Sequence, residues 1–197
     1  MKILESYTLC NRSKRPLNIE IDTIVIHHTG DFSCKGTLAW FKDPASKASA
    51  QYVIDLDGQI YKVVPEFMKA WHAGYSWFKG KYWVNNFSIG IELVGDGNKK
   101  QYTEAQMESL VWLCADIIKR NPKITIDRIT SHSHIRAEYQ KRGKVKVATK
   151  VDPGKYFDWV EFQKKLDKKL NPPTPKKQKS ENGLFSILSF IIKLFSR

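Results

Sequence analysis

The chain has 197 residues, 42% of them hydrophobic, and its 33 Lys and Arg against 20 Asp and Glu give it a formal net charge of +13. This size and hydrophobic content exclude a chain without a core and fit one ordinary domain with an additional segment, while the charge leaves nucleic acid, anionic lipid or an anionic polymer such as cell wall as partners. Its three cysteines have neither CxxC nor zinc-ribbon spacing, which argues against a disulfide framework. Glu5 and Ser6 interrupt the first apolar stretch, so we expect no signal peptide.

Hydrophobic patterns predict several strands in the first half of the chain. The β-branched run TIVIHH at 23–28 is typical of a buried strand. Residues 52–54 and 60–64 flank Asp57-Gly58, a dipeptide that favours a tight turn, and together they predict a β-hairpin. The run FSIGIELV at 87–94 predicts a further central strand.

Two helices are predicted in the second half. Thr103 and Gln106 match a capping box at the start of a helix that runs to residue 120, along which apolar side chains recur at three- and four-residue spacing. Asp158 and Glu161 offer a second capping box, for a helix that reaches residue 170. Mixed strands and helices of this kind predict an α/β fold with a single mixed central β-sheet flanked by helices.

The composition changes after residue 170. Residues 171–182 contain three prolines and no large apolar residue, which indicates a linker between a globular domain at 1–170 and a C-terminal segment at 183–197. That segment predicts an amphipathic helix with a narrow polar stripe. Such a helix reaches only about 21 Å, short of the ~30 Å hydrocarbon core, which favours a position on a membrane surface over a transmembrane one. Packing on the domain and self-association are the alternatives.

Three side chains far apart in the sequence have the chemistry of a zinc site. His27 stands at the end of a predicted strand, His132 follows a short apolar run, and Asp152 begins a DPG sequence. Two imidazoles and one carboxylate leave a fourth position for water, which is the arrangement of catalytic zinc. Plainer interpretations are a structural histidine for His27 and a simple turn for DPG. His134 is a rival to His132, because alternate residues of a strand face the same way.

Six motifs occur in order over about 130 residues of the chain: IVIHHTG (24–30), QYVIDLDGQIYKVVP (51–65), WHAG (71–74), NNFSIGIELVG (85–95), SHSHI (131–135) and KVDPGKYFDW (150–159). Together they resemble the type 2 N-acetylmuramoyl-L-alanine amidases, a family of phage endolysins, the bacterial amidase that recycles anhydro-muropeptides, and animal peptidoglycan-recognition proteins. The recycling-type and Gram-negative phage members are the most similar. The resemblance implies the amidase/peptidoglycan-recognition-protein-like fold.

The resemblance also implies a role for each matching residue. His27, His132 and Asp152 match the three ligands of a Zn²⁺ cofactor. Glu92 matches a catalytic glutamate of the recycling-type branch, and Lys150 matches a lysine that stabilises the oxyanion. Without the resemblance, Glu92 would be interpreted as a charge on the solvent face of a strand and Lys150 as a surface lysine. The residues implied in substrate binding are His72, His28 and Trp71.

The chain departs from the family pattern at three places. Ala50 stands where one phage branch carries a catalytic tyrosine, so more of the proton transfer would fall to Glu92. His134 replaces an acidic or amide residue. The interval between His132 and Asp152 is about twice that of the recycling enzyme, and its basic loop either rims the cleft and meets stem-peptide carboxylates or is a solvated insertion. The basic residues of this loop are Arg136, Lys141, Arg142, Lys144 and Lys146.

The expected activity is hydrolysis of the amide bond between the lactyl group of N-acetylmuramic acid and L-alanine in bacterial peptidoglycan. The first hypothesis is a phage or prophage endolysin, made in the cytoplasm and acting on the wall after release, because the basic charge and the C-terminal segment suit membranes. The alternatives are a cytoplasmic recycling amidase acting on soluble anhydro-muropeptides and a peptidoglycan-binding protein that does not cut. We expect a monomer with possible membrane-surface contact and no nucleic-acid partner, because no nucleic-acid-binding motif accompanies the charge.

Overall fold

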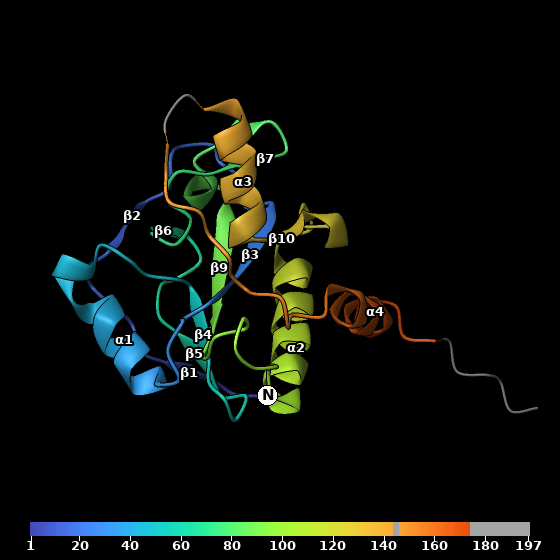
Figure 1. Ribbon diagram of the computed structural model, residues 1–197. Coiled ribbons are helices and arrows are strands. Elements are labelled where there is room, and N and C mark those ends of the chain that lie inside the picture. The colour runs from blue at the N-terminus through green and yellow to red at the C-terminus, as the bar shows by residue number, and fades with distance from the viewer. Residues whose placement is uncertain (144–145, 174–197) are drawn as a thin grey trace, which may run out of the picture.

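The computed structural model describes residues 1–143 and 146–173 (Figure 1). The strands are β1 Ile3–Glu5, β2 Arg12–Lys14, β3 Thr23–His28, β4 Tyr52–Ile54, β5 Ile60–Lys62, β6 Met68–Ala70, β7 Trp77–Phe78, β8 Lys81–Tyr82, β9 Ser88–Leu93 and β10 Ile129–Ser131. The α-helices are α1 Cys34–Lys42, α2 Glu104–Arg120, α3 His132–Arg142 and α4 Trp159–Leu170, and short 3-10 helices occupy Pro44–Ser46, Val84–Asn86 and Ile126–Arg128.

Six strands form a central sheet in the order β1-β5-β4-β9-β3-β10. Neighbouring strands are parallel except β4 and β5, which form the predicted hairpin with Gly58 at a φ of +85° in its turn. The sheet is therefore mixed, as the sequence predicts. Two smaller ladders, β2 with β6 and β7 with β8, lie outside the central sheet and are not predicted by the sequence pattern.

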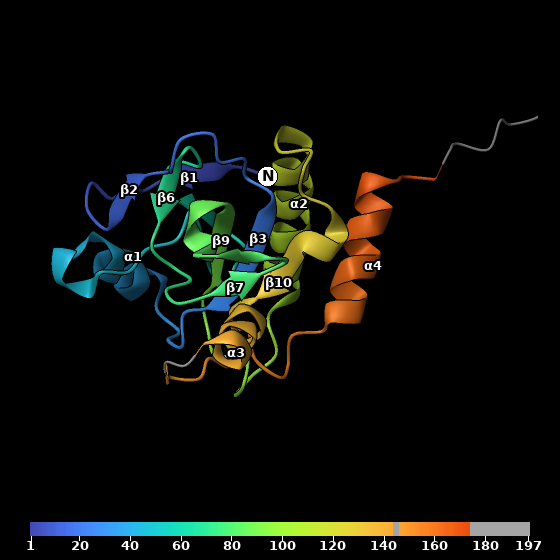
Figure 2. The same ribbon diagram turned by 90° about the horizontal axis from the view of Figure 1, so that it is seen from above.

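Alternation along β3 separates the two faces of the sheet. Ile24 and Ile26 enter the main hydrophobic core with α2 and α4, whereas Val25 belongs to a cluster on the other face, toward which His27 also points. Figure 2 shows α2 beside the sheet, α4 outside α2, and α1 on the opposite side. Since helices and apolar side chains fill the first face, polar chemistry is left to the second.

Both predicted capping residues open helices. The hydroxyl of Thr103 accepts from the N–H of Gln106 at 3.1 Å, and the side chain of Gln106 accepts from the N–H of Thr103 at 3.2 Å, which completes the box at α2. Asp158 caps α4 by accepting from the N–H of Glu161 at 2.9 Å. These two helix starts are confirmed.

The region after β10 differs from the prediction. The comparison of His134 with His132 assumes a strand through residue 134, and the basic residues that follow are expected in a loop. Both expectations are wrong for residues 132–142, which form α3. Ser131 ends β10, and its hydroxyl accepts from the N–H of His134 at 3.0 Å to cap α3. The helix then carries Arg136 and the basic residues up to Arg142. It buries polar side chains among apolar ones, so no apolar stripe marks it in the sequence.

The described chain closes with α4, which ends at Leu170, where the globular domain is predicted to end. Within residues 1–143 and 146–173, none of the helices has both the length and the apolar character that crossing a bilayer requires. The linker from residue 174 onward and the predicted amphipathic helix at 183–197 lie outside the described residues.

Candidate metal centre

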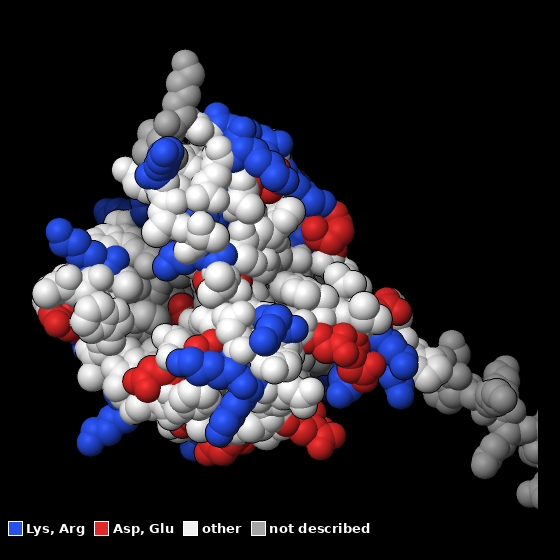
Figure 3. All heavy atoms as spheres, in the orientation of Figure 1, with Lys and Arg blue, Asp and Glu red and all other residues white. Residues whose placement is uncertain are grey.

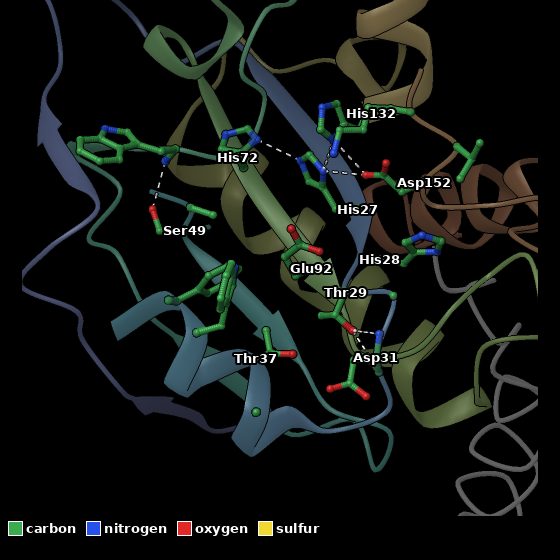
Figure 4. Close-up of a pocket in the computed structure, with 18 of the residues that line it drawn as sticks. His27, His28, Thr29, Asp31, Thr37, Ser49, His72, Glu92, His132 and Asp152 are labelled. Carbon is green, nitrogen blue, oxygen red and sulfur yellow. Dashed lines mark hydrogen bonds and ion pairs between the residues drawn. The ribbon is translucent and has the colours of Figure 1, made fainter. Parts of the chain in front are cut away.

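The site lies on the sheet face opposite α2, where three strands end close together. His27 on β3 and Glu92 on β9 are paired in register, so their side chains project from the same face as neighbours. On the other side of β3, β10 runs parallel and ends at Ser131, which places His132 at the first residue of α3. Figure 4 shows His27, His132 and Asp152 pointing toward one another, with Glu92 beside them.

His27, His132 and Asp152 bring three metal-binding atoms together. Nδ1 of His27 lies 3.1 Å from Nδ1 of His132, and Oδ2 of Asp152 lies 2.9 Å from the first and 3.1 Å from the second. Ligands bonded to zinc at about 2.0 Å in tetrahedral geometry stand roughly 3.3 Å apart, so this buried triangle is close to the size that zinc needs. The structure thus unites all three side chains that the sequence nominates, and together they could hold a metal ion.

The charges around this triangle suit a cation. Burial opposes ionisation of Asp152, but the hydrogen bonds with His132 and His27 hold the pKa of this carboxyl well below its usual range. Burial lowers the pKa of His132 to about 4. Burial also acts to lower the pKa of His27, yet the carboxylates of Glu92 and Asp152 outweigh it and raise that pKa. The site therefore attracts positive charge, which a metal ion could supply in place of a proton.

Glu92 has the environment of an acid–base group. Its Oε2 is buried and finds no hydrogen-bond partner in the described part of the chain, while the side chain lines a cavity. Burial raises the pKa of Glu92 to about 7, against the lowering effect of His27. A carboxyl group with a pKa near neutrality is suited to accept a proton and return it. A charge on the open solvent face of a strand does not describe this buried oxygen.

His72 lies behind His27, and both of its ring nitrogens face protein groups. Nδ1 of His72 is 2.9 Å from Nε2 of His27, and Nε2 of His72 is 3.2 Å from the hydroxyl of Ser88. Burial lowers the pKa of His72 well below its usual value. The sequence predicts a substrate contact here. The ring does border the cavity, but neither nitrogen is left over for a ligand.

His28 and Trp71, the other predicted substrate contacts, also line the cavity. Nδ1 of His28 accepts a hydrogen bond from the N–H of Gly97 at 3.0 Å, and burial lowers the pKa of this imidazole. With Nδ1 accepting, Nε2 is the nitrogen of His28 that can donate to a ligand. The indole N–H of Trp71 donates to the hydroxyl of Ser13 at 3.2 Å, which fixes the ring at the cavity wall.

Two glycines hold the loop that contains Asp152. A Cβ on Gly154, where φ is +98°, would lie 2.3 Å from the carbonyl carbon of Gly97. A Cβ on Gly97 would in turn lie 2.0 Å from the carbonyl oxygen of Pro153. This close backbone packing is available only to glycine, and it holds the loop in which Asp152 contacts His27 and His132. Lys150, two residues earlier, is exposed and lines the cavity.

The site opens into a cavity of about 730 Å³, one wall of which the sequence pattern does not predict. Helix α1 forms this wall through Thr37 and Trp40, and Trp40 is 55% exposed. An aromatic surface beside polar groups is typical of a ligand pocket. The only local sequence signal for α1 is its cap at Ser33, whose hydroxyl accepts from the N–H of Gly36 at 3.0 Å.

His134 and the basic end of α3 lie away from the triangle. The ring of His134 packs edge-on against Phe78 with centroids 6.0 Å apart. Residues two apart on a helix do not share a face, so the rivalry with His132 does not arise. The guanidinium of Arg142 stacks 3.4 Å above the centre of the Trp77 ring and does not line the cavity. Figure 3 shows basic side chains along the outer edge of α3, so its last turn does not form the predicted cleft rim.

The fold and the site define an α/β protein with a buried two-histidine, one-carboxylate centre at the mouth of a cavity. A family model described as N-acetylmuramoyl-L-alanine amidase matches residues 17–155. The chain belongs to the N-acetylmuramoyl-L-alanine amidase family, as its motifs predict.

Curated relatives point in the same direction. The chain is 41% identical over 116 residues to the 1,6-anhydro-N-acetylmuramyl-L-alanine amidase AmpD of Haemophilus influenzae, which covers 59% of this chain and 57% of the relative. It is 31% identical over 157 residues to the N-acetylmuramoyl-L-alanine amidase AmiD of Escherichia coli, covering 72% of this chain and 52% of the relative. The chain thus spans little more than half the length of these relatives.

Solved structures confirm the predicted fold class. A crystal structure of a selenomethionine AmpD derivative superposes with a TM-score of 0.71 at 31% identity, over 83% of this chain and 94% of that one. The Escherichia coli AmiD complex with anhydro-N-acetylmuramic acid-L-Ala-D-γ-Glu-L-Lys gives a TM-score of 0.63 at 28% identity, over 77% of this chain and 60% of that one.

Proposed function

We propose that this chain is a zinc-dependent amidase that hydrolyses the bond between the lactyl group of N-acetylmuramic acid and L-alanine. The observation that carries the proposal is the buried triangle of His27, His132 and Asp152, whose donor atoms lie 2.9 to 3.1 Å apart. Glu92 stands next to it on the same sheet face, and the four residues share one cavity. Membership of the amidase family and the names of AmpD and AmiD support the same reaction.

An amide is a poor electrophile and water a poor nucleophile. Zinc held by the three ligands would polarise the scissile carbonyl and bring the pKa of the attacking water toward about 7. Glu92 accepts the proton of that water at a carboxylate oxygen and delivers it to the leaving nitrogen of L-alanine. Lys150 stabilises the negative charge that develops on the carbonyl oxygen. Ala50 is fully buried and offers no proton, so the transfer falls to Glu92.

The walls of the cavity would bind the muropeptide around the reacting bond. Trp40 and Trp71 present aromatic surface to it, which suits the apolar faces of a sugar or peptide. Nε2 of His28 supplies a directed hydrogen bond. We assign orientation of the substrate to these three side chains and the chemical step to Glu92 and Lys150.

We favour soluble anhydro-muropeptides over intact wall as the substrate, which is the alternative in the sequence prediction rather than its first hypothesis. The relative with 41% identity is named a 1,6-anhydro-N-acetylmuramyl-L-alanine amidase. The AmiD structure contains an anhydro-N-acetylmuramic acid peptide. The endolysin hypothesis depends on the basic charge and on the segment 183–197, which lies outside the described residues. A soluble substrate also implies a place of action in the cytoplasm.

The test is to incubate the purified chain in parallel with soluble anhydro-muropeptide and with intact sacculi, and to measure released L-alanyl peptide by mass spectrometry. We expect faster release from the soluble substrate, and none from either substrate with His27→Ala. Release from sacculi but not from the soluble substrate would contradict the recycling role and support the endolysin role. No release from either substrate by the zinc-loaded parent would refute the amidase proposal.

A further inference from the structure

One buried polar residue of the site takes no part in the reaction described above. His72 is only 9% exposed, and its two ring nitrogens contact Nε2 of His27 and the hydroxyl of Ser88. We propose that His72 is a positioning residue, which selects the tautomer of His27 that leaves Nδ1 free to bind a metal ion. This inference rests on the proposed metal site.

The direction of the hydrogen bonds is set at the far end, by Ser88. Its hydroxyl has one hydrogen, which it donates to the carbonyl oxygen of Val84 at 2.7 Å. The oxygen of Ser88 therefore acts as the acceptor toward Nε2 of His72 at 3.2 Å, and Nε2 carries the proton. A buried imidazole with no carboxylate among its hydrogen-bond partners is neutral, so Nδ1 of His72 is a bare acceptor.

The same logic continues to His27. Nδ1 of His72 accepts the hydrogen of Nε2 in His27 across 2.9 Å. In the neutral form of His27, a proton on Nε2 leaves Nδ1 unprotonated, and Nδ1 is the atom that faces His132 and Asp152. In the opposite tautomer, Nδ1 of His27 would carry a proton that points at His132 and Asp152. The unprotonated Nε2 of His27 would then face the unprotonated Nδ1 of His72, and their lone pairs would repel each other. A metal-binding histidine is commonly oriented by a carboxylate or a carbonyl, and here an imidazole takes that place.

The fold holds the ring of His72 in this orientation. A Cβ on Gly90 would lie 2.5 Å from Cγ of His72, so the ring packs directly on the backbone of β9. The N–H groups of His72 and Ala73 both donate to Oδ1 of Asn85, at 3.1 and 2.8 Å. By contrast, Nε2 of His132 is buried without a partner in the described part of the chain. The orienting contact therefore serves His27.

The test combines a tautomer measurement with zinc binding. In the metal-free chain labelled with ¹⁵N-histidine, NMR at a pH where His27 is neutral should show it protonated at Nε2. His72→Phe keeps an aromatic ring but has no acceptor, and it should weaken zinc binding about 10- to 100-fold. His72→Asn retains an acceptor oxygen near the position of Nδ1, and its zinc affinity should stay within about threefold of that of the parent. Phe87→Leu loosens the apolar cluster that contains Val25 and Ala73, which lie close in the chain to His27 and His72, without removing these hydrogen bonds, and it should lower Tm while leaving zinc affinity unchanged.

Two results would overturn the inference: a proton on Nδ1 rather than Nε2 in the neutral form of His27 in the metal-free parent, or equal zinc affinity in His72→Phe and the parent. Should His72→Phe not fold, Ser88→Ala removes the acceptor of Nε2 in His72, together with the hydrogen bond to Val84. A decrease in the Nε2-protonated population of neutral His27 is then expected, and an unchanged population overturns the inference. These readouts do not involve hydrolysis. A chain with the expected tautomer and zinc affinity that cleaves no muropeptide would refute the proposed activity alone.

Discussion

Replacing Glu92 by glutamine removes a group that titrates differently in the folded and unfolded chains. Burial raises the pKa of Glu92 in the folded, metal-free protein to about 7, from 4.5. The folded state then binds more protons than the unfolded state at intermediate pH. The stability linked to Glu92 is therefore present below pH 4.5 and is lost as the pH rises through about 7. Between pH 5 and pH 8 this loss amounts to about 2–3 kcal/mol.

Glutamine has no charge to bury, so Glu92→Gln should escape this loss. The free energy of unfolding of Glu92→Gln minus that of the parent should therefore be about 2–3 kcal/mol larger at pH 8 than at pH 5, which means that the variant gains stability relative to the parent. Urea denaturation of EDTA-treated chains at the two pH values measures the difference. Glu108→Gln, on an exposed position of α2, is the matched control and should follow the parent. An equal offset between Glu92→Gln and the parent at both pH values would refute the raised pKa and its use in proton transfer.

Three further substitutions or truncations probe other parts of the account. Lys150→Ala should lower kcat by about 10²-fold or more with zinc content unchanged; a parent-like kcat on muropeptide would remove Lys150 from the mechanism. Gly154→Ala should cost about 1–3 kcal/mol of stability and weaken zinc binding, because its Cβ meets the backbone of Gly97; denaturation and zinc titration check this, and parent-like values would contradict the close packing. Truncation after Leu170 should preserve hydrolysis and reduce binding to anionic vesicles, and equal vesicle binding by both chains would contradict the predicted membrane association of segment 183–197.

The elements that the sequence predicts are those with a strong local signal. The run at 23–28, the hairpin around Gly58 and the capped helix α2 each combine a periodic apolar pattern with a turn or cap residue. Helix α3 lacks this signal, because it buries His132 and Arg136 together with Ile135 and Tyr139. Helix α1 is short and contains a glycine, so its cap alone does not distinguish it from a loop.

The site could be nominated from motifs but not assembled from them. His27 and His132 are 105 positions apart, and only the parallel pairing of β3 with β10 explains why they meet. The contacts of His72 depend on the orientation of its ring. That orientation is possible only because Gly90 has no Cβ where the ring packs. No sequence pattern encodes that orientation. The sequence pattern does not predict that Trp40 lines the cavity, because the local signal for helix α1 is too weak to predict the helix that carries it.

The central claim is that His27, His132 and Asp152 together hold one zinc ion. The direct measurement is the zinc content per chain after exhaustive dialysis, by mass spectrometry of the metal, for the parent and for His27→Ala, His132→Ala and Asp152→Ala. We predict stoichiometric zinc in the parent and its loss, together with the loss of hydrolysis, in each variant that keeps only two ligands. Stoichiometric zinc in all three variants, or full hydrolysis by a metal-free parent, would contradict the account.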